Sequence, residues 1–395
     1  TMADNKDKKV LNVPHLRFPE FRGEWEKCSI QDYGEVVTGN TPPTSHAEYY
    51  ENGSYLWASP ADLGINKNIT ETKTKLSLSG FKKTRNIPKG SVLVTCIGST
   101  IGKMGMATET MSSNQQINSI VVNDKSNSDF VYYAICRAFP RYLSEVSVQA
   151  VPILSKSNFE KLPNYTTCRD EQAKIGYFLN LLDERIATQN KVIEDLKKLK
   201  SAIAERVYNC RTYQLYRIGD VIEQVSKRNN SMSIDKVLSV SNKLGFINQS
   251  EQFEDRIVAS EDTSNYKIVY KDDFAYNPAR INVGSIARLK HFNKGIVSPM
   301  YICFRVKQGI ALDYLEYFFT TNYFFNEMQK RLEGSVRQCL SFEGLCNIPI
   351  YIPNLDEQQK MGRKVSVIME KIDNENRYLD SLKMQKKYLL RQMFI

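Results

Sequence analysis

The chain has 395 residues, 42% of which are hydrophobic, and a formal net charge of +10 at pH 7. This length exceeds that of one ordinary domain and the apolar content allows more than one core, so we expect a multidomain protein. No run approaches the ~18 apolar residues of a membrane span, and the polar N-terminus, residues 1–6, lacks the apolar segment of a signal peptide. The sequence therefore predicts a cytoplasmic protein.

Cysteine usage argues against a disulfide framework or a zinc site. The sequence contains no Cys-x-x-Cys pair, and no cysteine has a histidine close to it in sequence. We therefore expect reduced, mostly packed thiols. The eight cysteines are Cys28, Cys96, Cys136, Cys168, Cys210, Cys303, Cys339 and Cys346.

The first block, residues 1–153, combines strand-like and helical stretches. Ser91–Ile97 and Ile117–Val122 are short apolar runs that turn residues separate from their neighbours, and they predict strands. Phe130–Tyr142 is an aromatic stretch with helical character. We expect an α+β module with a small, irregular sheet.

A long helix is predicted from Asp170 to Tyr208. Its apolar residues step by four and three over about five heptads, with polar breaks at Gln189 and Lys200, which is typical of a coiled-coil seam. The helix would be roughly 55 to 60 Å long, and a helix of that length cannot bury its apolar stripe alone. The seam residues are Ile175, Leu179, Leu182, Ile186, Ile193, Leu196 and Ile203.

The second block, residues 211–339, matches the first at a few anchor points. Trp25–Asp32 aligns with Tyr213–Asp220, whereas the sequences between the anchors share almost nothing. Ile296–Val306 predicts a strand, and the aromatic stretch Leu312–Lys330 predicts a helix. We expect a second α+β module of the same kind.

A second long helix, with the same heptad pattern, follows the second block. Residues 154–208 and 340–394 align without a gap at a constant offset of 186, with 15 identities in 55 positions. The chain is therefore a tandem duplication of a block plus a helix, and each helix is the natural partner of the other. The second seam consists of Met361, Val365, Ile368, Ile372, Leu379, Leu382 and Leu389.

A catalytic constellation is not evident. Gly98–Met104 is one residue short of a phosphate-binding loop, and Asn277–Arg280 lacks the second proline and the aromatic residue of an adenine-methyltransferase motif, so it predicts a turn. None of the three histidines lies beside a plausible nucleophile, and no acidic cluster has metal-ligand spacing. This favours binding over catalysis, with no metal or cofactor in this chain.

Polar and basic loops in both blocks are candidates for contact with DNA. The two long helical segments carry charges of zero and +3, so +7 lies elsewhere. Arg, Lys, Asn and Gln bind base edges in the major groove, whereas Lys, Ser and Thr bind phosphates. The candidates are Thr38, Asn40, Thr41, Lys82, Lys83, Arg85, Ser99, Thr100, Lys103, Asn114, Gln115, Lys227, Arg228, Asn277, Arg280 and Arg288.

The duplicated pattern carries a family resemblance over essentially the full length. In both halves a Leu-Ser pair, a proline-containing segment and Asp-Glu-Gln precede the heptad helix, and Ile352–Gln359 is the most specific piece. The first copy departs from it at residues 166–169, where Thr-Thr-Cys-Arg replaces the apolar-proline segment. The chain resembles the specificity subunit of type I restriction-modification enzymes.

The resemblance implies an α+β fold with two target recognition domains in tandem, residues 1–153 and 211–339. Each is followed by a spacer helix region, residues 154–210 and 340–395, and the two helices would pair as an antiparallel coiled coil with pseudo-two-fold symmetry. The two domains would read a split DNA target, with half-sites of order one helical turn, ~34 Å, apart. Two methyltransferase subunits and restriction subunits would be partners, and S-adenosylmethionine, ATP and Mg would bind to those partners.

Two other hypotheses stay open at this point. One is a two-headed adaptor whose blocks bind proteins or glycans and whose helices dimerise. The other is a self-contained nuclease or methyltransferase, which the missing motifs disfavour. The salt dependence of binding to duplex DNA would separate the first from a DNA reader.

Overall fold

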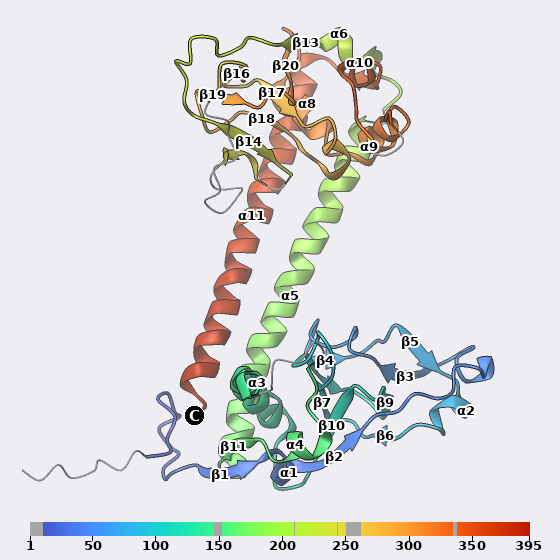
Figure 1. Cartoon of the computed structure of the whole chain (residues 1–395), viewed down its shortest axis with the longest axis vertical. Helices are drawn as coiled ribbons and strands as arrows, with labels where there is room; N and C mark the ends of the chain where they lie inside the picture. The colour runs from blue at the N-terminus through green and yellow to red at the C-terminus, as the bar shows by residue number, and fades with distance from the viewer. Residues whose placement is uncertain (1–10, 146–151, 209, 243, 250–261, 335–337) are drawn as a thin grey trace, which may run out of the picture. The chain divides into compact units, whose positions relative to one another are not determined.

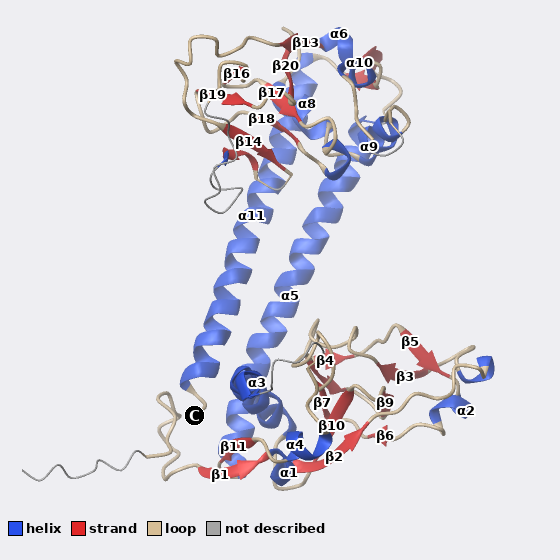
Figure 2. Ribbon diagram, in the orientation of Figure 1, coloured by secondary structure: helices blue, strands red, loops and turns tan. Residues whose placement is uncertain are grey.

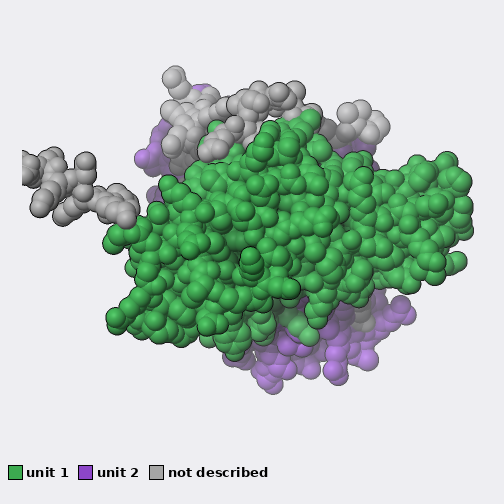
Figure 3. Space-filling model, turned by 90° about the horizontal axis from the view of Figure 1, so that it is seen from below, with its two compact units in different colours: residues 1–191, 377–395 green, residues 192–376 purple. Residues whose placement is uncertain are grey.

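The computed structural model describes residues 11–145, 152–208, 210–242, 244–249, 262–334 and 338–395, so the polar N-terminal residues 1–6 lie outside the described part. The chain forms two compact units (Figure 3). Unit 1 comprises residues 1–191 and 377–395, and unit 2 comprises residues 192–376. The predicted domain boundaries at residues 153, 210 and 339 stay a prediction. The compact units do not test them, because each unit includes parts of both long helices.

Two mixed sheets and a helix build the block of unit 1 (Figure 1). The five-stranded sheet has the order β2-β10-β7-β8-β4, and the four-stranded sheet has the order β5-β3-β9-β6. Their bounds are β2 Gly34–Thr38, β3 Tyr55–Ala58, β4 Asn68–Ile69, β5 Thr74–Leu76, β6 Asn86–Ile87, β7 Val92–Thr95, β8 Met104–Ala107, β9 Met111–Ser113 and β10 Ile117–Val122. The short helices are η1 Ala47–Tyr49 and α2 Leu78–Phe81.

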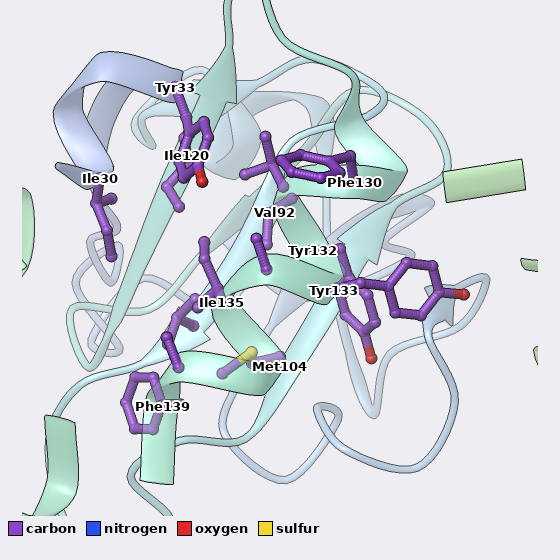
Figure 4. Close-up of a cluster of buried hydrophobic side chains, with 14 of the residues drawn as sticks. Ile30, Tyr33, Val92, Met104, Ile120, Phe130, Tyr132, Tyr133, Ile135 and Phe139 are labelled. Carbon is purple, nitrogen blue, oxygen red and sulfur yellow. The ribbon is translucent and has the colours of Figure 1, made fainter. Parts of the chain in front are cut away.

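The central strand β7 is buried on both faces. Val92 and Val94 pack in the core beneath helix α3 (Ser128–Glu145), whereas Leu93 belongs to a separate cluster on the other face of the sheet. Figure 4 shows Val92 and Phe130 of the first cluster. The predictions of strands near residues 91–97 and 117–122 and of a helix over 130–142 are confirmed by β7, β10 and α3.

A two-stranded sheet closes unit 1 where the block meets the long helix. β1 (Glu26–Ser29) pairs antiparallel with β11 (Pro163–Thr166), the proline-containing segment of the repeat. The backbone N–H of Ser29 donates to the carboxylate of Asp32 at 2.7 Å, which caps α1 (Ile30–Tyr33). Helix α4 (Lys156–Glu160) precedes β11.

Unit 2 repeats this plan with smaller sheets. A four-stranded sheet has the order β13-β20-β17-β18, and two-stranded sheets join β14 to β15, β16 to β19 and β12 to β21. The strands are β12 Gln214–Arg217, β13 Ile222–Val225, β14 Leu238–Ser241, β15 Gly245–Asn248, β16 Lys267–Tyr270, β17 Phe274–Tyr276, β18 Ile286–Arg288, β19 Lys294–Val297, β20 Ile302–Val306 and β21 Pro349–Ile352. The short helices are α6 Ile218–Val221, η2 Ile281–Val283, α8 Leu312–Phe318, α9 Asn322–Gln329 and α10 Phe342–Cys346.

Two sequence predictions in unit 2 were wrong in detail. The stretch 296–306 is not one strand, because a turn at residues 298–301 separates β19 from β20. The stretch 312–330 is two helices, because Thr321 caps a new helix: its hydroxyl accepts from the backbone N–H of Phe324 at 3.0 Å. The prediction for Asn277–Arg280 is confirmed, since these residues lead into and form a turn after β17.

The long helices α5 (Arg169–Tyr208) and α11 (Leu355–Gln392) lie side by side and antiparallel within each unit (Figure 2). In unit 1, Asp183 pairs with Lys386, and the guanidinium of Arg185 lies 5.5 Å from the ring centroid of Tyr378. In unit 2, Ala204 shares a core with Val365. The antiparallel helix pairing that the resemblance implied is thus present in both units.

The seam side chains face protein rather than solvent. None of the fourteen is exposed, and Leu179, Val365, Leu382 and Leu389 are each less than 10% exposed. The buried ones are Ile175, Leu179, Ile193, Val365, Ile372, Leu379, Leu382 and Leu389, and the half-buried ones are Leu182, Ile186, Leu196, Ile203, Met361 and Ile368.

We expect Leu179→Ala to lower the free energy of unfolding of unit 1 by about 2 to 5 kcal/mol, because the truncation leaves a cavity. Leu181→Ala, two residues along the same helix at a side chain that is 45% exposed, should change it by less than about 0.5 kcal/mol. Urea denaturation followed by tryptophan fluorescence measures both, since the two tryptophans, Trp25 and Trp57, lie in unit 1. Equal effects of the two changes would contradict the seam.

The glutamine of each Asp-Glu-Gln motif fastens the block helix to the long helix. The side-chain oxygen of Gln172 accepts from the backbone N–H of Asn127 at 2.8 Å, and that of Gln358 accepts from Ala311 at 2.8 Å. Both glutamines are 2% exposed. The glutamine of each repeat thus provides a hydrogen-bond acceptor at the start of α3 or α8.

Gln358→Ala should lower the free energy of unfolding by about 1 to 3 kcal/mol, because it leaves the partly buried N–H of Ala311 and the carbonyl of Pro353 without these partners. Hydrogen exchange at the Ala311 amide should accelerate accordingly. The exposed neighbour Gln359 gives the matched control, since Gln359→Ala removes no such contact. Unchanged exchange at Ala311 in the Gln358 variant would contradict this role.

Candidate nucleic-acid interface

Three polar loops of unit 1 converge beside β2 and β9. The backbone N–H of Asn40 donates to the carbonyl of Ser113, its side-chain amide donates to the carbonyl of Lys83 at 2.9 Å, and its side-chain oxygen accepts from the backbone of Arg85 at 2.8 Å. Asn40 therefore ties the loop after β2 to the loop after α2. The predicted residues Lys82, Lys83 and Arg85 lie exposed on that second loop.

The third loop follows β9. The hydroxyl of Thr41 donates to the side-chain oxygen of the exposed Gln115. A Cβ on Gly39 would lie 2.2 Å from the carbonyl oxygen of Ser113, so the close approach of the two backbones requires glycine. Within unit 1 the sequence candidates at 38–41, 82–85 and 114–115 are therefore brought together.

Two of these candidates shape the loops rather than project from them. Asn114 is 8% exposed, and its side-chain oxygen accepts from the backbone of Gln116 at 3.0 Å. The hydroxyl of Thr38 donates to Asn118 at 2.7 Å, while the guanidinium of Arg85 donates to the carbonyl of Thr38. The exposed side chains with donor groups that are not used in these contacts are those of Lys82, Lys83, Arg85 and Gln115.

The turn that contains Ser99, Thr100 and Lys103 joins the antiparallel strands β7 and β8. A phosphate-binding loop leads from a strand into a helix, so this turn is not one. The turn adjoins the Gln115 loop, since the backbone N–H of Cys96 donates to the carbonyl of Gln116 at 2.8 Å. Ser99 and Lys103 are exposed and Thr100 is half-buried.

The candidates of unit 2 form two separate groups. Lys227 and Arg228 are exposed beside β16, where Arg228 donates to the side-chain oxygen of Asn265 at 2.9 Å. Arg280 is exposed in the turn after β17, whereas Asn277 is 8% exposed and its side-chain oxygen accepts from the backbone of Ala279. Among the described residues, no hydrogen bond or ion pair joins the two groups.

Arg288 is withdrawn from the candidate set. Its side chain is 10% exposed and forms ion pairs with Asp272, Asp313 and Glu316, the last at 3.1 Å. These contacts hold β18 against the first turns of α8, so the guanidinium is not available to a phosphate or a base. The pattern of basic residues along the chain gave no sign of these distant acidic partners.

Sequence reasoning also missed a buried ion-pair network in unit 1. The ammonium of Lys67, which is 8% exposed, donates to Asp129 and, at 2.8 Å, to Asn180 of α5. The hydroxyl of Tyr133 donates to Asp183 at 2.7 Å. Burial, with the negative charge of Asp183 adding to it, raises the pKa of Tyr133, so the phenol stays protonated as a donor.

The described residues show no metal site and no membrane span. No group of three or more His, Cys, Asp or Glu side chains in the described ranges could hold a metal ion. No described helix is long and apolar enough to cross a membrane. All eight cysteines are free, and burial raises the pKa of Cys96 to about 12.

A family model described as "Type I restriction modification DNA specificity domain" matches the chain twice, over residues 22–198 and 211–384. The chain belongs to this family. The resemblance read from the repeated Asp-Glu-Gln motif is thereby confirmed, and so is the fold class: two specificity domains in tandem, each followed by a long helix. The adaptor hypothesis gains no support.

Two curated type I specificity subunits align over most of the chain, and a third aligns over less than half of it. The type I restriction enzyme MjaIX specificity subunit of Methanocaldococcus jannaschii is 25% identical, covering 91% of this chain and 90% of its own length. The MjaVIII specificity subunit of the same organism is 23% identical, covering 98% and 95%. The HindI specificity subunit of Haemophilus influenzae is 28% identical over 44% of this chain and 39% of its own length.

Solved structures from type I systems share the fold. The S subunit of a type I restriction-modification system from M. genitalium superposes with a TM-score of 0.62 and 17% identity, covering 97% of this chain and 99% of that one. A chain from a study of complex assembly and conformational transition of the type I R-M system gives a TM-score of 0.56 and 13% identity, covering 96% and 99%. At these identities, both similarities show a shared fold and nothing more.

Proposed function

We propose that this chain is the non-catalytic, DNA-reading subunit of a type I restriction-modification complex. Each block reads one half of a split target, and the two long helices act as a spacer between the readers. Half-sites would then lie of order one helical turn, ~34 Å, apart. A DNA target implies action in the cytoplasm.

The convergence of three polar loops in unit 1 is the observation that carries the proposal. Lys82, Lys83 and Arg85 supply cations on one loop, and Gln115 supplies an amide on the loop tied to it through Thr41. Lysine ammonium groups position a duplex through its phosphates, while arginine and glutamine can hydrogen-bond base edges. A set of loops that hydrogen bonds hold together, with both chemistries, supports readout of a half-site.

The catalytic partners are part of the proposal. Two methyltransferase subunits and the restriction subunits would dock on this chain, and S-adenosylmethionine, ATP and Mg would bind to those partners. The described residues of this chain offer no cluster of metal-ligating side chains. Its own contribution is to bind DNA and to position the partner enzymes.

Mapping of methylated adenines tests the proposal. The full chain is co-expressed with its candidate methyltransferase subunit, and the modified positions in the host DNA are read by sequencing. We expect one split motif with a gap of fixed length and unspecified sequence. Methylation of a single continuous motif, or methylation by the purified chain without a partner, would overturn the proposal.

A further inference from the structure

In unit 1, an arginine from outside the repeat engages the glutamate of the Asp-Glu-Gln motif. Arg17 donates from Nε and Nη2 to the two carboxylate oxygens of Glu171, at 2.7 and 2.8 Å. Glu171 is fully buried, and its hydrogen bond raises the pKa of Arg17. This bidentate geometry is the one that an arginine and a carboxylate favour.

Arg17 belongs to a loop, residues 11–24, that we term the N-terminal arm. Two backbone hydrogen bonds hold the arm. The N–H of Leu16 donates to the carbonyl of Gln392 at the end of α11, and the N–H of Trp25 donates to the carbonyl of Asn12, which joins the two ends of the arm. Trp25, the first residue after the arm, is only 2% exposed, and its ring packs against those of Phe130 and Phe394. The arm thus covers the start of α5.

A second arginine fills the same region of unit 1. Arg169, the first residue of α5, donates from Nη1 to the backbone carbonyls of Asp124 and Ser126, the latter at 2.7 Å. Two guanidinium groups therefore occupy the space around the beginning of this helix, one from the helix itself and one from the arm.

The corresponding site in unit 2 has neither arginine. Glu357 matches Glu171, but it is half-buried, and its carboxylate forms no hydrogen bond or ion pair within the described part of the chain. Leu355 stands where unit 1 has Arg169 and is 44% exposed. Of residues 199–212, which would match the arm, 199–208 form the end of α5 and 211–212 lie in a turn.

A groove lies open at this site. Its volume is about 710 Å³, and Tyr213, Ile310, Ile352, Pro353, Leu355 and Glu357 are among the residues that line it. Tyr213 matches the buried Trp25 of unit 1 but is only half-buried.

The other charged groups in the groove are already engaged. Lys307 donates to the backbone carbonyls of Gly219 and Asp220, at 3.3 and 3.1 Å. The carboxylate of Asp220 accepts from the backbone of Arg217 at 2.7 Å. Glu357 is therefore the carboxylate left for an incoming cation.

We propose that this groove receives a segment of another protein that carries an arginine, whose guanidinium binds Glu357 as Arg17 binds Glu171. The side chains of Tyr213 and Leu355 in the lining would cover the aliphatic stem of the arginine, and the planar guanidinium matches the carboxylate better than an ammonium does. The occupant would do for unit 2 what the N-terminal arm does for unit 1. This goes beyond the DNA-reading function and does not depend on it.

A peptide spanning Leu11–Glu24 of this chain serves as the probe, because it carries the required chemistry. Fluorescence anisotropy measures its binding to the full-length chain. We expect saturable binding that weakens by about ten- to a hundred-fold with an Arg17→Gln peptide, or with a Glu357→Gln chain, because the charge-assisted pair cannot form. The Glu343→Gln chain, changed at an exposed glutamate of α10, should bind like the unaltered chain.

Three results would overturn the proposal. One is the absence of saturable binding at millimolar peptide, and another is binding that Glu357→Gln leaves unchanged. The third is self-association of the full chain in sedimentation that Glu357→Gln abolishes, because the occupant would then be the arm of a second copy. Thermal unfolding should be the same for Glu357→Gln and the unaltered chain; a lower unfolding temperature would mean that this chain already engages Glu357.

Discussion

Replacing Lys82, Lys83 and Arg85 together by glutamine is expected to weaken binding of duplex DNA by on the order of a hundred-fold, because each charged interaction is worth on the order of 1 kcal/mol or more. The dependence of affinity on salt should also become shallower, by roughly one unit of log-log slope for each phosphate that the variant no longer binds. Electrophoretic mobility shifts over a range of salt concentrations measure both effects. All three side chains are exposed, so the fold should be retained.

A matched variant distinguishes the effect of this loop on DNA affinity from the effect of the total charge of the chain. Lys27, Lys125 and Lys161 are also exposed in unit 1, on β1 and on loops outside the candidate interface. Their joint replacement by glutamine removes the same charge but should reduce affinity only several-fold. If both triple variants lose affinity equally, the net charge of the chain, rather than the converging loops, attracts DNA.

Arg17→Ala is expected to destabilise unit 1 by about 3 to 5 kcal/mol, because it leaves the carboxylate of Glu171 buried without its cationic partner. The arm should detach as a consequence and expose Trp25. Urea denaturation followed by tryptophan fluorescence gives the free energy of unfolding, and the emission maximum should shift to longer wavelength even before denaturation.

Lys174→Ala provides the comparison. Lys174 also pairs with the arm, through Glu20, but both side chains are more than 40% exposed. An exposed ion pair is worth about 0 to 1 kcal/mol, so this change should have little effect. Similar losses for the two variants would show that Arg17 has no special role in holding the arm.

The long helices could be predicted from the sequence because their information is local and periodic. Apolar residues such as Leu196 and its counterpart Leu382 occupy the same heptad positions in the two copies, and the duplication identified each helix as the partner of the other. Strands β7 and β10 were equally accessible, since both are short apolar runs with turn residues between them. Breaks inside such runs were harder to predict. The start of α9 depends on the single hydroxyl of Thr321, which lies within a continuous aromatic stretch.

The candidate interface was only partly predictable for a different reason. Loop residues such as Lys83 and Gln115 could be selected by type, but their convergence depends on sheet pairing between distant segments. Arg288 and Lys67 were misjudged or missed for the same reason. Asp313 lies 25 positions from Arg288 and Asp129 lies 62 positions from Lys67, and no local pattern points to these partners. The role of Arg17 has no counterpart in the repeat at all.

The glutamine contacts of the repeated motifs bear on how such a chain can diversify. On the side of the block, Gln172 and Gln358 bind main-chain groups: the amides of Asn127 and Ala311 and, for Gln358, also the carbonyl of Gly309. Mutations that alter side chains of a block leave these amides in place. A block can therefore drift, or be replaced through recombination at its two ends, while its junction with the helix is inherited unchanged.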